Sequence, residues 1–116
     1  MKTLLMILAL VPSTLMAATG KKATLAQELK LNPAEKVIKV LASPSFKVIG
    51  LGFKQGQVLA KHQTPTPAIL IVQTGSVEFK MSGETQTLKA GDFFEIPAKI
   101  DHEVVGLEDS LLYLIK

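Results

Sequence analysis

Two stretches of sequence decide the fold: residues 56–75, GQVLAKHQTPTPAILIVQTG, and residues 91–102, GDFFEIPAKIDH. Each contains short runs rich in β-branched and aromatic residues, and glycines and prolines separate these runs. Such spacing is typical of short strands joined by tight turns. Residues 68–72 are apolar at every position, which predicts a strand that is covered on both faces.

The same pattern continues on both sides of these stretches and predicts an all-β domain over residues 37–116. A first strand is expected over 37–41, because the β-branched residues Val37, Ile38 and Val40 outweigh a helical interpretation. Short connections predict that consecutive strands are antiparallel neighbours. The remaining expected strands are 46–54, 57–61, 68–74, 76–81, 85–88, 93–96, 103–107 and 111–115.

The N-terminus has the layout of a secretory signal peptide over residues 1–17. Lys2 precedes the apolar run 4–11, which Pro12 ends before the small residues Ala17 and Ala18. A run this short cannot span a bilayer, so no membrane anchor is expected. The mature protein is therefore predicted to be periplasmic or secreted.

Residues 18–36 form a polar segment between the leader and the β domain. Thr24 and Gln27 have the spacing of a capping box, which predicts a short helix ending near Leu31.

Composition excludes several classes of function. The chain has no cysteine, so it has neither a disulfide nor a thiolate nucleophile. Its 13 basic residues are all lysine, and the formal net charge is only +3. Without arginine or a basic stripe, nucleic acid is not an expected partner. No serine lies in a nucleophile elbow, so nothing supports a hydrolase.

The glycines and histidines of the two quoted stretches are spaced as paired motifs, and 15 residues separate Gly75 from Gly91. This pairing resembles the two motifs of the cupin superfamily in its small bacterial single-domain members. The resemblance implies a cupin-like, jelly-roll β-barrel made of two antiparallel sheets. The residues that carry it are Gly56, His62, Gly75, Gly91, Pro97 and His102.

The resemblance also implies a metal site, but this chain matches it only in part. Cupins bind metal through two histidines and a glutamate of the first motif and one histidine of the second. Here His62 and His102 match, whereas Thr64 and Ala68 occupy the other two positions. Two interpretations stay open: a weak site for a divalent transition metal at His62 and His102, or pocket histidines held by hydrogen bonds.

Nearby acids offer little to replace the missing ligands. Asp101 and Glu103 flank His102, so on an extended segment they point away from its face. Residues 93–96 show no clean alternation of apolar and polar residues, so the sequence does not predict which face of the strand carries Glu95.

These features favour a small-molecule-binding module whose barrel mouth is lined by His62, Thr64 and His102. The alternatives are a metal-dependent enzyme of the dioxygenase or isomerase type, and a structural homodimer without catalysis. A homodimer is expected in any case, because edge strands are costly to leave unpaired.

Overall fold

The computed structural model describes residue 20 and residues 22–116. The predicted signal peptide and the start of the polar segment lie outside the described residues. No helix within the described part of the chain is long and apolar enough to cross a membrane.

One short helix and nine strands make up the described chain. The helix is shorter than predicted, and residues 37–42 form a strand as expected. The elements are α2 (Leu25–Glu28), β1 (Val37–Ala42), β2 (Val48–Phe53), β3 (Val58–His62), β4 (Ala68–Thr74), β5 (Ser76–Met81), β6 (Glu84–Lys89), β7 (Phe93–Ile96), β8 (His102–Gly106) and β9 (Ser110–Ile115).

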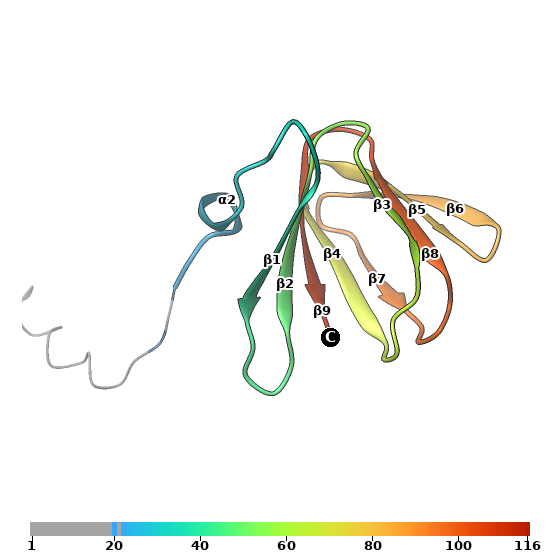
Figure 1. The fold of residues 1–116 in the computed structure, drawn as a ribbon, viewed down its shortest axis with the longest axis horizontal. Helices are drawn as coiled ribbons and strands as arrows, with labels where there is room; N and C mark the ends of the chain where they lie inside the picture. Colours follow the sequence, from blue (N-terminus) through green and yellow to red (C-terminus); the bar gives the residue numbers. More distant parts are fainter. Residues whose placement is uncertain (1–19, 21) are drawn as a thin grey trace, which may run out of the picture.

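The strands form two facing antiparallel sheets, which confirms the predicted all-β, cupin-like fold (Figure 1). One sheet has the order β1-β2-β9-β4-β7, and the other has the order β3-β8-β5-β6. The prediction that consecutive strands are neighbours is wrong for most of the chain, because only β1–β2 and β5–β6 pair in this way. The other connections cross from one sheet to the other.

Glycines in the left-handed region of backbone space make these crossings short. Gly75 is the single residue between β4 and β5, and its φ is +84°. A side chain there would clash with the Asp109 carbonyl. A connection of one residue can therefore join strands of different sheets, so the length of a connection does not determine which strands pair.

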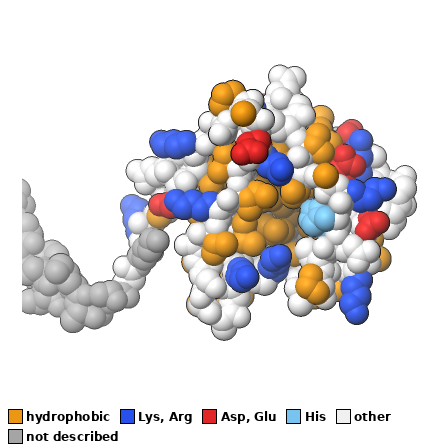
Figure 2. All heavy atoms as spheres, viewed as in Figure 1, with side chains coloured by type: hydrophobic (Ala, Val, Ile, Leu, Met, Phe, Trp, Pro, Cys, Tyr) orange, Lys and Arg blue, Asp and Glu red, His pale blue; other side chains and the backbone are white. Residues whose placement is uncertain are grey.

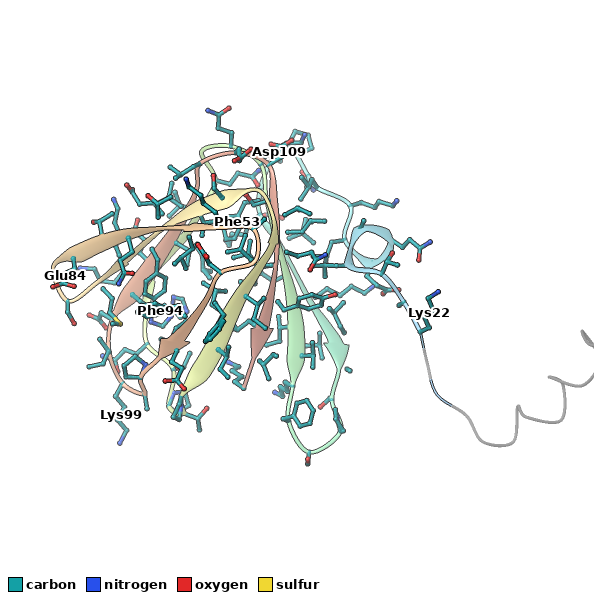
Figure 3. The ribbon with its side chains drawn as sticks, turned by 180° about the vertical axis from the view of Figure 1, so that it is seen from behind. Lys22, Phe53, Glu84, Phe94, Lys99 and Asp109 are labelled. Atoms are coloured by element: carbon teal, nitrogen blue, oxygen red, sulfur yellow. The ribbon has the colours of Figure 1, made fainter. Side chains whose placement is uncertain are left out.

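The core lies between the inner faces of the two sheets. Figure 3 shows Phe53 and Phe94 inside the barrel, whereas Glu84 and Lys99 lie on its periphery and Lys22 lies on the N-terminal segment outside it. The largest fully buried hydrophobic side chains come from both sheets: Phe53, Phe79, Leu51, Leu70, Leu112, Val72, Val77 and Val104.

Strand β4 is covered on one face only, so the prediction of two covered faces is wrong. Ala68, Leu70 and Val72 point into the core, whereas Ile69 is 37% exposed and Ile71 is half-buried. The described residues place no layer over this part of the outer face. An uninterrupted apolar run therefore did not distinguish a buried strand from one with an apolar outer surface.

The N-terminal segment packs on the outer face of β2. The Thr24 hydroxyl caps α2 by accepting a hydrogen bond from the Gln27 amide at 3.3 Å. Leu25 and Leu29 are buried, and a Cβ atom on Gly50 would lie only 2.9 Å from Leu29 Cδ1. Glycine at position 50 therefore makes room for the segment on the sheet.

Candidate functional site

The two histidines of the chain meet across neighbouring strands. In the β3–β8 ladder Leu59 pairs with Val104 and His62 pairs with His102. Two residues separate the paired positions on β3, but only one separates them on β8, so β3 contains a bulge. Leu59 packs against the core, and the extra residue places His62 on that same inner face in place of Lys61.

The histidine rings are in contact and have matching hydrogen bonds. Their centroids are 4.3 Å apart, with 59° between the ring planes. Nδ1 of His62 lies 2.8 Å from the Ala60 carbonyl, and Nδ1 of His102 lies 3.0 Å from the Ile100 carbonyl. A carbonyl can only accept, so each Nδ1 carries the proton and each Nε2 has a free lone pair in the neutral ring.

Burial favours the neutral form of His102, which is 4% exposed. Desolvation lowers the pKa of His102 below 6.5, and the neighbouring His62 lowers it further. The hydrogen bond to Ile100 and the charge of Asp101 raise this pKa, but they do not outweigh the burial. His102 therefore presents a neutral acceptor nitrogen at neutral pH.

Two phenylalanines pack on the His102 side of the histidine pair. Phe79 stacks on His102 with centroids 5.7 Å apart, and Phe94 contacts Phe79 at 4.5 Å. In Figure 2 a histidine, drawn in pale blue, borders a hollow lined with hydrophobic side chains. An apolar surrounding strengthens any polar contact made to the two nitrogens.

Thr64 and Ala68 are buried and offer little to a metal. Thr64 Oγ1 donates to the Thr66 carbonyl at 2.8 Å, and the Thr64 carbonyl accepts from the Lys99 amide. The second bond ties the β3–β4 loop to the β7–β8 loop, whereas the first lies within the β3–β4 loop. Ala68 is 3% exposed and belongs to the core. The contribution of Thr64 to a ligand pocket stays a prediction.

Neither Glu95 nor Asp101 joins the pair in a group of metal ligands, although Asp101 is close enough to His102 to raise its pKa. Glu95 is exposed on the outer face of β7, because Ile96 and the half-buried Phe94 occupy the inner side. Asp101 is exposed as well. Among the described residues, no group of three or more His, Cys, Asp or Glu side chains could hold a metal ion.

The register reveals one neighbour that sequence reasoning missed. Met81 of β5 pairs directly with His102, on the side opposite His62. No spacing motif connects position 81 to the histidines, so only the strand pairing places it there.

Comparison with solved structures shows the same fold in several bacterial proteins. A conserved protein of unknown function from Streptococcus pyogenes is 21% identical, with a TM-score of 0.75 over 84% of this chain and 86% of its own. A cupin superfamily protein from Desulfitobacterium hafniense is 14% identical, with a TM-score of 0.76 over 84% and 91%. KdgF from a Halomonas species is 27% identical, with a TM-score of 0.64 over 75% and 83%.

Comparison with curated protein sequences finds no match. The family model described as "Cupin domain" matches residues 51–115, which is more than half of the chain and includes both histidines. The paired motifs, the two facing sheets and this match agree, and the chain belongs to the cupin family.

Proposed function

We propose that the protein is a binding module that holds a small molecule at the His62–His102 pair. The observation that carries this proposal is the matched orientation of the two rings, each with Nδ1 bonded to a backbone carbonyl. Two acceptor nitrogens side by side suit a ligand with hydrogen-bond donors. Phe79 is buried and packs against the His102 ring, so it supports the position of that ring.

Metal-dependent catalysis has less support. Catalytic metal sites usually keep three protein ligands, and Thr64 and Ala68 stand where two of the family's ligands would be. A divalent transition metal would be held by His62 and His102 alone, and we expect it to bind weakly.

Titration of ¹⁵N-labelled protein with small phenols, alcohols and amines tests the proposal. We expect one class of these probes to shift the side-chain resonances of His62 and His102 together. The effect should disappear in His62→Gln and persist in Gln63→Ala, an exposed neighbour that serves as the control. Shifts that spare both histidines for every probe would overturn the proposal.

We also propose that the protein works outside the cytoplasm. The support is the signal-peptide layout of residues 1–17. Mass spectrometry of the extracytoplasmic fraction should find a mature chain beginning at Ala18 or Thr19. A chain that retains Met1 in that fraction would contradict the proposal.

A second role, assembly into a homodimer, is favoured by strand β1. This strand lies at the edge of its sheet, and Ile38 and Val40 are 52% and 55% exposed. An edge strand with exposed apolar side chains and unpaired backbone N–H and C=O groups can pair with a strand of another chain. We propose that a second copy of the chain pairs with it.

A further inference from the structure

Strand β7 ends the five-stranded sheet opposite β1 (Figure 1). It pairs with β4 on one side, and within the described part of the chain no strand pairs with its other side. The Val72 amide donates to the Asp92 carbonyl at 2.9 Å, so the alternation of an antiparallel ladder makes Phe94 the next position bonded to β4. The backbone N–H and C=O groups of Phe93 and Glu95 therefore point to the free edge.

The outer face of this edge has one aromatic and one acidic side chain. Phe93 is 68% exposed, and Glu95 is exposed two residues further along the same face. Phe93 is paired with Ile71 and Glu95 with Ile69, so each lies beside an apolar side chain of β4. A hollow of about 440 Å³ lies beside Glu95, and its other lining side chains, among them Ile69 and Ile115, are apolar. This edge therefore offers free backbone groups, an apolar surface and one negative charge.

These features fit an extended segment that adds a strand beside β7. Hydrogen bonds to the backbone of Phe93 and Glu95 give such a segment affinity, and its alternate side chains give specificity. Two outward side chains of the segment, two positions apart, then lie beside Phe93 and Glu95. An apolar residue suits the first position. Lysine or arginine suits the second, because its apolar stem can lie toward the hollow while its charge meets the carboxylate.

A second copy of the chain has one strand with this pattern, but the basic residue in it is engaged. Val37 and Lys39 lie two positions apart on the outer face of β1. Lys39 Nζ lies 2.9 Å from Glu28 Oε1 in the same chain. This ion pair would have to break before Lys39 could meet Glu95 of another copy, so the charge of the edge favours a different partner.

We propose that β7 binds an extended segment of another protein that has an apolar and a basic residue two positions apart. The segment pairs with the free edge through the backbone of Phe93 and Glu95. This edge belongs to the sheet that does not contain His62 and His102, so the proposal does not depend on small-molecule binding at the histidine pair.

Titration of ¹⁵N-labelled protein with two peptides tests the edge. The first probe is a ten-residue peptide of serine and threonine with one valine and one lysine two positions apart, and the second has glutamate in place of the lysine. We expect the lysine peptide to shift the amide resonances of Phe93 and Glu95 and to slow their hydrogen exchange, because both amides gain an acceptor. It should bind about threefold or more tightly than the glutamate peptide.

Charge reversal at the edge supplies the matched variants. Glu95→Lys should reverse the preference between the two peptides, whereas Glu84→Lys, at an exposed position of β6 in the other sheet, should retain it. Equal binding of the two peptides, or exchange of the Phe93 and Glu95 amides that neither peptide slows, would overturn the proposal. Protection of these amides that rises with protein concentration in the absence of peptide would also overturn it, because that result assigns the edge to a second copy.

Discussion

Replacing Thr64 with histidine and Ala68 with glutamate would restore the two ligands that the family's metal site has and this chain lacks. We expect the double variant to bind zinc about a thousandfold more tightly, which corresponds to about 4 kcal/mol. The reason is that zinc sites are stable with four protein ligands, whereas His62 and His102 supply two.

The structure sets the cost of this change. Ala68 is 3% exposed and packs in the core, so a larger side chain there should destabilise the metal-free protein by about 1–3 kcal/mol. Zinc at a concentration equal to the original protein's Kd stabilises that protein by only about 0.4 kcal/mol. The same concentration should stabilise the double variant by about 4.1 kcal/mol, which exceeds the packing cost.

Calorimetric titration and thermal unfolding with and without zinc measure both quantities. Each kcal/mol corresponds to about 4–8 °C in Tm for a domain of this size, so the contrast is readily observed. Gln63→His with Thr66→Glu places the same groups at exposed positions and should gain little. A folded double variant that binds zinc no better than the original protein would refute the interpretation of the pair as a degraded metal site.

Three further predictions follow from the described contacts. Burial lowers the pKa of His102, so as the pH falls this side chain is protonated in the unfolded chain before it is protonated in the folded one. The urea concentration at the unfolding midpoint should therefore decrease as the pH is lowered from about 7.5 to about 5.5, and it should decrease less in His102→Gln. Leu29→Ala should cost about 2–5 kcal/mol in urea unfolding, because Leu29 is 3% exposed, whereas Lys30→Ala should cost almost nothing. Light scattering at micromolar concentration should give a dimer mass that Val40→Lys reduces to a monomer mass, and a monomeric original protein would contradict the pairing of β1.

Local sequence patterns predicted the elements of the fold but not their pairing. The strand at 37–42 followed from three β-branched residues, and the turn at Gly75 followed from its position between two β runs. Strand neighbours depend on contacts between distant residues, such as Val77 with Gly106. Loop length does not encode those contacts when a single glycine can turn the chain into the facing sheet.

The sequence predicted that His62 and His102 share one pocket, and their rings lie 4.3 Å apart, but their role as a binding site stays a prediction. Motif spacing identified His62 and His102, because the family resemblance places both on one pocket. The bulge in β3 and the position of Met81 beside His102 depend on how β3, β8 and β5 align with one another. The local sequence pattern does not specify this register. The facing of Glu95 stayed open for a similar reason, since Phe93 is 68% exposed although its residue type favours burial.

The protonation of the two imidazoles decides whether the pair can bind a ligand, because binding there requires both Nε2 atoms to be free. Long-range ¹H–¹⁵N correlation spectra of the histidine side chains at neutral pH report which ring nitrogen carries the proton. We predict protonated Nδ1 and bare Nε2 on both His62 and His102, with both Nε2 resonances moving together when zinc is added. Protonated Nε2 on either ring, or resonances that do not move when zinc is added, would show that the pair does not bind ligands as proposed.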